Sequence, residues 1–163
     1  MFDDHLLNLA RLTLDEAQQR RLKIATAESC TGGLILGLLT EIPGSSATVE
    51  RGFIVYSNKA KEEMLNVPGD LIADAGAVSE PVARAMAEGA LAESRANLAI
   101  AVTGVAGPDG GTALKPVGLV HIAVARENKA IFHQAMRFGN IGRSQVRRET
   151  IVTALEMARK LMN

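Results

Sequence analysis

The chain has 163 residues, which is enough for one domain with a sizeable hydrophobic core. Hydrophobic residues make up 47% of the sequence and aromatic residues only 3%, so aliphatic side chains must fill that core. The 18 basic and 18 acidic residues give a formal net charge of zero. This balance argues against bulk binding to nucleic acid or to a membrane surface, because both need a basic surplus.

The sequence also bears on the cellular compartment and on the number of domains. Cys30 is the only cysteine, so no internal disulfide can form, and a reducing cytoplasm is the simplest setting. The acidic start around Asp3 and Asp4 lacks the basic region of a signal peptide, and no apolar stretch reaches the roughly 20 residues of a membrane helix. With no repeat and no linker rich in Pro or Ser, residues 1–163 are expected to form a single domain.

Apolar periodicity and turn residues predict alternating helices and strands in the first half of the chain. The expected elements are a helix over residues 4–20, a strand over 23–27, a helix over 34–40, a strand over 53–56 and a helix over 59–65. Asp3 or Asp4 can cap the first helix, and Pro43-Gly44 should end the second.

The second half continues the alternation. Ser79 before Glu80 and Pro81 is typical of a helix start, with a capping hydroxyl followed by a proline in the first turn. Beyond that helix we expect strands over residues 98–102, 117–125 and 130–138, and a last helix over 141–162. Because residues 126–129 make a short connection, an antiparallel hairpin should join the last two strands. The pattern predicts an α/β fold with helices on both faces of a mixed sheet.

Ligands of such sheets bind beyond the carboxyl ends of the parallel strands, and three polar segments follow predicted strands. The first is TAESCTGG at residues 26–33. Free main-chain N–H groups at a helix start can hold an anion or an oxyanion, and Ser29 is placed as a nucleophile if a base reaches it. Taken alone, the segment is explained slightly better as a simple helix N-cap. Cys30 is either a rival nucleophile or a packing residue.

The second polar segment is YSNKAK at residues 56–61, which follows the second predicted strand. A lysine partly buried beside a serine hydroxyl can lose its proton and act as a base, and Tyr56 can assist by hydrogen bonding. On the residue pattern alone, Lys59 and Lys61 are better explained as solvated lysines on a short helix.

The third segment is TGVAGPDGG at residues 103–111. The connection over residues 104–116 is long for a compact domain, and long ordered loops are usually functional. Its glycines expose N–H groups that can hold a phosphate or a carboxylate, although a wide turn is the alternative. The segment lacks the Gly-Lys-Ser/Thr ending of a nucleotide phosphate loop and is not a dinucleotide fingerprint.

A basic group, Arg143, Arg147 and Arg148, opens the last predicted helix. Arg143 and Arg147 continue the apolar stripe of that helix, so they should lean toward the protein and suit a phosphate. An exposed basic cluster is the alternative interpretation. The scattered histidines do not have metal-ligand spacing, so no metal site is predicted.

Together these segments resemble the C-terminal domain of the CinA family of competence/damage-inducible proteins. The matching motifs are TAESCTGG at 26–33, GSS at 44–46, RGF at 51–53, YSN at 56–58 with Lys61, GAVSEP at 76–81, and TGVAGPDGG at 103–111 with KPVG at 115–118. The combination spans nearly the whole chain and is specific, although each piece alone is weak. Larger family members carry an extra N-terminal domain for which there is no room here, so the stand-alone form is expected.

The resemblance implies a three-layer α/β/α sandwich with a mixed, mostly parallel five-stranded sheet. It also implies a nicotinamide mononucleotide deamidase, which hydrolyses the carboxamide of nicotinamide mononucleotide to nicotinic acid mononucleotide and ammonia. No metal and no organic cofactor is required for this reaction. Carried over by motif, Ser29 is the nucleophile, Lys61 is its general base and Tyr56 is a helper or a substrate contact.

The expected substrate-binding residues are Thr31, Gly32, Gly33, Thr103, Gly104 and Arg143. Thr103 and Arg143 are carried over from the family, and the N–H groups of residues 31–33 are the expected oxyanion donors. Residues 139–142 form a small insertion relative to the usual family pattern, directly before Arg143. The element that meets the substrate's phosphate stays undecided between the loop after Thr103 and the arginines.

Two other functions fit the same residues. One is a non-catalytic module that binds a nucleotide phosphate, and the other is a serine amidohydrolase acting on a different amide. The expected partner is a small-molecule substrate, a pyridine mononucleotide, with neither nucleic acid nor membrane. A homodimer is the default oligomeric state.

Overall fold

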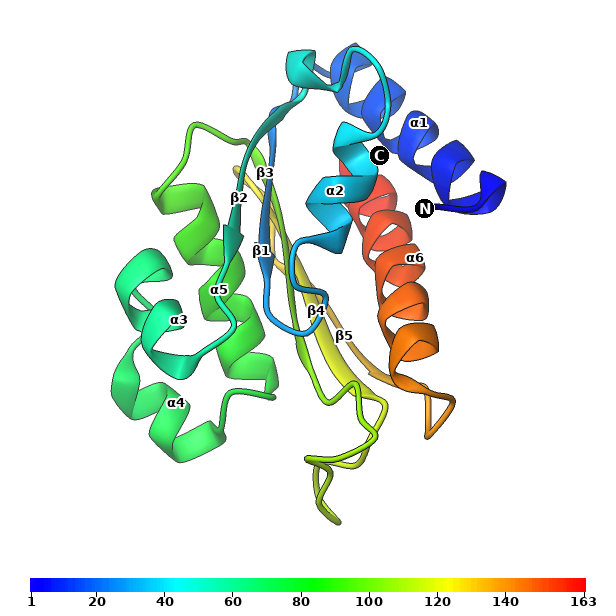
Figure 1. The fold of residues 1–163 in the computed structure, drawn as a ribbon. Helices are drawn as coiled ribbons and strands as arrows, with labels where there is room; N and C mark the ends of the chain where they lie inside the picture. Colours follow the sequence, from blue (N-terminus) through cyan, green and yellow to red (C-terminus); the bar gives the residue numbers. More distant parts are fainter.

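The computed structural model describes all 163 residues as a five-stranded sheet covered by helices on both faces (Figure 1). The strands are β1 (Ile24–Glu28), β2 (Val49–Ile54), β3 (Leu98–Gly104), β4 (Leu119–Arg126) and β5 (Phe132–Arg137). The helices are α1 (Asp4–Gln19), α2 (Leu34–Thr40), α3 (Asn58–Leu65), α4 (Gly69–Ala75), α5 (Glu80–Ala92) and α6 (Arg143–Met162), with a short 3-10 turn, η1 (Ser45–Ala47).

The strand order is β2-β1-β3-β4-β5. Strand β1 pairs in parallel with β2 and β3, whereas β4 is antiparallel to both β3 and β5. Four of the five strands therefore run in one direction, and the predicted mixed, mostly parallel sheet is confirmed. The carboxyl ends of β1, β2 and β3 lie at one edge of the sheet, so the three polar segments that follow them are neighbours.

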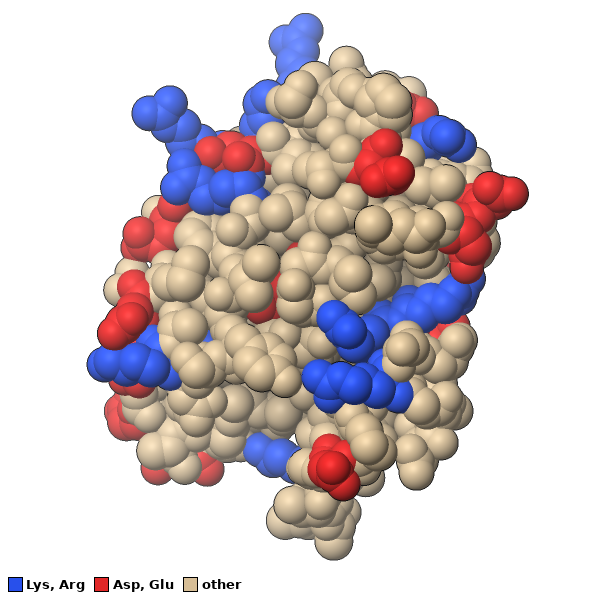
Figure 2. Space-filling view, in the orientation of Figure 1, with Lys and Arg blue, Asp and Glu red and all other residues tan.

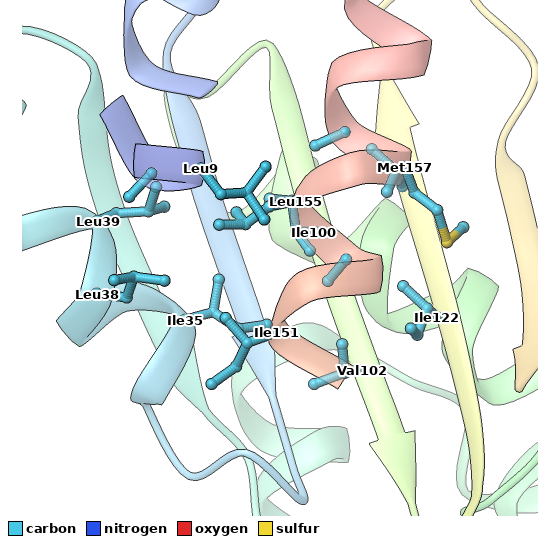
Figure 3. Close-up of a cluster of buried hydrophobic side chains, with 14 of the residues drawn as sticks. Leu9, Ile35, Leu38, Leu39, Ile100, Val102, Ile122, Ile151, Leu155 and Met157 are labelled. Carbon is cyan, nitrogen blue, oxygen red and sulfur yellow. The ribbon is translucent and has the colours of Figure 1, made fainter. Parts of the chain in front are cut away.

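Helices α1, α2 and α6 cover one face of the sheet and α3, α4 and α5 cover the other, which confirms the three-layer sandwich (Figure 1). Branched aliphatic side chains fill the first layer. Figure 3 shows Ile100, Val102 and Ile122 of the sheet facing Leu155 and Met157 of α6, and all five are buried.

Alanines line the opposite face, where Ala99, Ala101 and Ala123 of the sheet are fully buried under α5. Small side chains let a helix lie close to the sheet. On the outer side of α5, a Cβ added at Gly89 would lie 2.1 Å from the carbonyl oxygen of Leu65, so only glycine fits between α5 and α3.

Predicted helix starts agree with the observed caps. Asp3 caps α1 through a 2.9 Å hydrogen bond from the N–H of Leu6, and Ser79 caps α5 by accepting from the N–H of Val82. Two features differ from the sequence prediction. Helix α4 was not predicted, and β2 begins at Val49 rather than at residue 53. None of the six helices is long and apolar enough to cross a membrane.

Candidate active site

A cavity of about 220 Å³ opens at the carboxyl edge of β1, β2 and β3. It is lined by Ser29, Cys30, Tyr56, Asn58, Lys61, Ala77, Val78, Thr103, Gly104, Ala106 and Arg143. The lining contains two basic residues and no acidic one.

Ser29 is the first residue after β1 and is 8% exposed. Its N–H donates to the carbonyl of Val102 in the neighbouring strand β3 at 3.1 Å, so the main chain of the serine is tied to the sheet. This bond fixes the start of the turn that leads into α2. The Ser29 side chain reaches the cavity, where a nucleophile would have to lie.

Lys61 lies on α3, whose start is set by Ser57, the N-cap that accepts from the N–H of Ala60 at 3.0 Å. The Lys61 side chain points back under its own helix and is only 1% exposed. Its Nζ lies 3.0 Å from Oγ of Ser29, 2.9 Å from the carbonyl oxygen of Val55 and 3.2 Å from that of Tyr56. The two side chains that the sequence pairs as nucleophile and base are therefore in hydrogen-bond contact.

No carboxylate oxygen lies within 4.0 Å of Lys61 Nζ, since none of the ion pairs of the chain includes this residue. Burial disfavours the charged form of an amine, and desolvation lowers the pKa of Lys61 from its ordinary value of 10.5. A neutral amine has two N–H groups and one lone pair. The carbonyls of Val55 and Tyr56 match the two donors, which leaves the lone pair for the hydroxyl of Ser29.

Glu28 is a residue of this region that the sequence did not single out. It is fully buried, and its carboxylate accepts four hydrogen bonds. The donors are Thr31 Oγ1 at 2.6 Å and the N–H groups of Gly33 at 3.1 Å, Ile35 at 3.0 Å and Leu36 at 2.9 Å. The carboxylate thus caps the start of α2, where Gly33 offers no side-chain cap.

These contacts occupy two of the three expected oxyanion donors. The N–H of Gly33 is taken by Glu28, and the N–H of Gly32 donates to the carbonyl of Ser29 at 3.1 Å. The Thr31 hydroxyl is turned inward to Glu28, and none of the three residues lines the cavity. The N–H groups of Cys30 and Thr31 have no acceptor within the protein, so they are the free amides of this turn.

Cys30 borders the cavity but is only 6% exposed, and it belongs to the hydrophobic core. Desolvation raises the pKa of Cys30 to about 12. Since the thiolate is the reactive form, this cysteine is protonated and poorly nucleophilic at neutral pH. Of the two interpretations that the sequence left open, packing fits the structure better than nucleophilic attack.

Thr103 and Gly104 end β3 and line the cavity. The Thr103 hydroxyl donates to the carbonyl of Ala77 at 2.9 Å, which holds the segment before α5 against the sheet. A Cβ at Gly104 would lie 2.9 Å from the carbonyl oxygen of Leu119, so glycine is needed for the close approach of β4. Both residues lie where a ligand of Ser29 would contact them.

Tyr56 and Arg143 stand at the mouth of the cavity. The Tyr56 ring is exposed, and its hydroxyl accepts a 3.4 Å hydrogen bond from the Arg143 guanidinium. Arg143 also donates to the carbonyl of Gly107 at 2.8 Å, so it links α6 to the loop after β3. Elsewhere, no group of three or more His, Cys, Asp or Glu side chains is arranged to hold a metal ion.

The family model for the CinA C-terminal domain matches residues 7–162. The chain belongs to this CinA family. A CinA-like protein of Gemmatimonas aurantiaca is 48% identical over 153 residues, a match that covers 94% of this chain and 35% of the relative. A CinA-like protein of Mycobacterium sp. (strain JLS) is 50% identical over 139 residues, which covers 85% of this chain and 33% of the relative. The CinA domain described here thus spans about a third of the length of these curated relatives.

Solved CinA structures share its fold. The competence/damage inducible protein CihA from Agrobacterium tumefaciens superposes with a TM-score of 0.98 at 52% identity, covering 100% of this chain and 99% of the other. A CinA superfamily protein from Escherichia coli gives a TM-score of 0.89 at 30% identity, covering 99% and 93% of the two chains.

Within this CinA domain, the cavity brings together six of the nine residues that the sequence and the resemblance proposed. They are Ser29, Tyr56, Lys61, Thr103, Gly104 and Arg143. The other three, Thr31, Gly32 and Gly33, shape the turn behind Ser29 instead of lining the cavity.

Proposed function

We propose that this CinA domain hydrolyses the carboxamide of nicotinamide mononucleotide to nicotinic acid mononucleotide and ammonia. One observation carries the proposal: the buried amine of Lys61 has no carboxylate partner and lies 3.0 Å from the hydroxyl of Ser29. A serine beside a deprotonated lysine is an activated nucleophile, and an amide carbonyl is a substrate that needs one. The choice of the mononucleotide rests on the resemblance to CinA proteins.

In the proposed reaction the neutral amine of Lys61 accepts the proton of the Ser29 hydroxyl. The serine oxygen then attacks the carboxamide carbon and forms a tetrahedral intermediate. The free N–H of Cys30 directly follows Ser29, and Cys30 lines the cavity, so we assign this N–H to the oxyanion. The Lys61 ammonium returns its proton to the leaving nitrogen, and ammonia departs as the carbon–nitrogen bond breaks.

Water completes the reaction. It attacks the acyl-serine while Lys61 takes up a water proton and then returns it to the Ser29 oxygen, which releases the acid. A direct attack by a water molecule positioned by Ser29 and deprotonated by Lys61 gives the same products without an acyl-enzyme. Trapping an acyl-enzyme on Ser29 distinguishes the two routes.

An ammonia-release assay on nicotinamide mononucleotide tests the proposal. The wild-type chain should release ammonia, and Ser29→Ala and Lys61→Met should release it far more slowly. Binding of the mononucleotide without turnover would favour a non-catalytic binding module and contradict the proposal. Covalent labelling of Ser29 by an amide-directed reagent, without ammonia release from the mononucleotide, would favour a serine amidohydrolase with another substrate.

A further inference from the structure

Two arginines at the start of α6 lie near the candidate active site: Arg143 lines the cavity, and Arg147 contacts the turn that follows Ser29. Arg143 and Arg147 are four residues apart, so their side chains lie on the same face of the helix, one turn from each other. Arg143 donates to the carbonyl of Gly107 at 2.8 Å, in the loop after β3. Arg147 donates to the carbonyl of Thr31 at 3.1 Å, in the turn that carries Ser29.

Neither guanidinium has a counter-charge. No carboxylate oxygen lies within 4.0 Å of Arg143 or Arg147, whereas the adjacent Arg148 pairs with Asp3 at 2.8 Å and with Glu149 at 3.2 Å. The difference is notable because all three arginines lie within two turns of one helix.

Arg147 also has unused donors. A guanidinium carries five N–H donors, and the contact with Thr31 uses only one of those of Arg147. Its Nε is buried and has no acceptor at all. A half-buried cation with unsatisfied donors is costly to keep unless an anion binds there.

The surroundings add to the positive potential. No acidic residue lines the cavity, so nothing there offsets the charge of Arg143. Helix α6 is 20 residues long, and Gly142 provides no side-chain cap at its positive end. Figure 2 shows Lys and Arg side chains gathered over this end of α6. Guanidinium groups bind phosphate through paired donors, so a phosphate monoester fits this place better than a neutral group.

We propose that Arg143 and Arg147 form the subsite for the phosphate monoester of the substrate, and that Arg147 determines the preference for a phosphorylated ligand. The identity of the rest of that ligand rests on the proposed function. A phosphate held between the two guanidiniums gives them the counter-charge that the protein does not supply. Its place beside the turn that carries Ser29 leaves the opposite end of the ligand free to enter the cavity.

Calorimetric titration with ribose 5-phosphate, and with ribose as its phosphate-free counterpart, tests the subsite. We expect the wild type to bind ribose 5-phosphate and to discriminate against ribose. Arg147→Met should weaken ribose 5-phosphate binding about tenfold or more, because a charge-assisted hydrogen bond is lost. Arg148→Met is the matched control, since its partners are Asp3 and Glu149, and its affinity should stay within about twofold. Equal affinity of the wild type and Arg147→Met for ribose 5-phosphate would overturn the proposal.

A kinetic comparison separates this role from a structural one, because Arg147 also contacts the turn of Ser29. For nicotinamide mononucleotide, Arg147→Met should raise KM about tenfold, whereas kcat/KM for nicotinamide riboside should not change. An equal loss with both substrates would show that Arg147 acts only through the turn, and would contradict the subsite. Ribose 5-phosphate has no amide, so its binding tests the subsite even if the mononucleotide releases no ammonia.

Discussion

Lys61 and Ser29 are 32 residues apart in the sequence, yet the Lys61 Nζ lies 3.0 Å from the Ser29 Oγ in a buried contact. The contact joins α3 to the turn after β1, two elements that meet only because β1 and β2 are parallel neighbours. Its chemistry depends on the absence of a carboxylate, since a salt bridge would hold the amine protonated.

Removing the amine should separate activity from stability. Lys61→Met keeps the length of the side chain and removes the desolvated amine, so the melting temperature should not fall, whereas ammonia release should drop by about 10²–10⁴-fold. Ser29→Ala should lose activity to at least the same extent. Differential scanning calorimetry and the ammonia assay on the same samples check both statements. A large loss of stability in Lys61→Met would show that the lysine is mainly structural.

The pH dependence of activity should follow the deprotonation of the Lys61 amine. The base is the neutral form, so kcat/KM should rise with pH through the folded-state pKa of Lys61, which burial places below 10.5. Rate profiles of the wild type should therefore show an acidic limb that ends below pH 10.5. The residual activity of Lys61→Met should lack that limb.

Stability should respond to the same titration. Between the lowered folded-state pKa and 10.5, the unfolded chain binds more protons at Lys61 than the folded chain does. The contribution of Lys61 to the free energy of unfolding therefore becomes more favourable as the pH rises across this window. Urea denaturation of the wild type and of Lys61→Met should show a stability difference that shrinks toward pH 10.5. A difference that is constant with pH would contradict the lowered pKa.

Glu28 should be essential to the turn. Glu28→Gln places an amide NH₂ among four donors, which leaves at least one buried donor unsatisfied and should lower the free energy of unfolding by about 2 kcal/mol. Activity should fall as well, because the turn that these bonds hold carries Ser29. The exposed Glu41 at the end of α2 provides the control, and Glu41→Gln should change stability by less than about 0.5 kcal/mol. Chemical denaturation measures both.

The Cys30 thiol should be unreactive in the native protein. Its burial and its raised pKa, about 12, predict little reaction with an aromatic disulfide reagent at pH 8 and rapid reaction in urea. Cys30→Ala provides the blank. Fast labelling of Cys30 in the folded protein would contradict this prediction and would make Cys30 a rival of Ser29 as the nucleophile.

The stacked pair His121 and His133 should make the fold sensitive to acid. Their rings share a 3.0 Å N···N contact, and burial lowers both pKa values from 6.5. The unfolded chain therefore takes up protons first as the pH falls below 6.5, so stability should decrease by up to about 1.4 kcal/mol per pH unit for each histidine. His133→Gln should flatten this dependence, while His5→Gln, at an exposed position, should not. Thermal unfolding between pH 5 and 7 checks the comparison.

The sequence predicted most elements because their signals are local. Ser79 and Pro81 mark the start of α5, and the apolar runs of β3 and β4 mark buried strands. Strand β2 lies at the edge of the sheet, and residues 49–52 are only partly buried, so its first half lacks an apolar pattern. Helix α4 is seven residues long with one buried side chain, Ile72, which is too short for periodicity to identify.

Some residues of the candidate site could be predicted from the sequence, and others could not. Ser29 was a candidate nucleophile from its place between a predicted strand and a predicted helix. Lys61 came from the resemblance to CinA proteins, since nothing in the local pattern around Lys61 distinguishes it from a solvated lysine. The capping role of Glu28 depends on burial that only the packing of α2 creates, and a glutamate at a strand end has no local signal for it. The homodimer expected from the sequence stays a prediction, which sedimentation analysis can check.

The uncompensated amine of Lys61 also bears on the end of the proposed reaction. Hydrolysis turns a neutral carboxamide into a carboxylate beside a lysine that lacks an acidic neighbour. The carboxylate of the product is then the only counter-ion of Lys61. A protonated Lys61 would therefore hold the product in the cavity. Added nicotinic acid mononucleotide should accordingly inhibit more strongly as the pH falls.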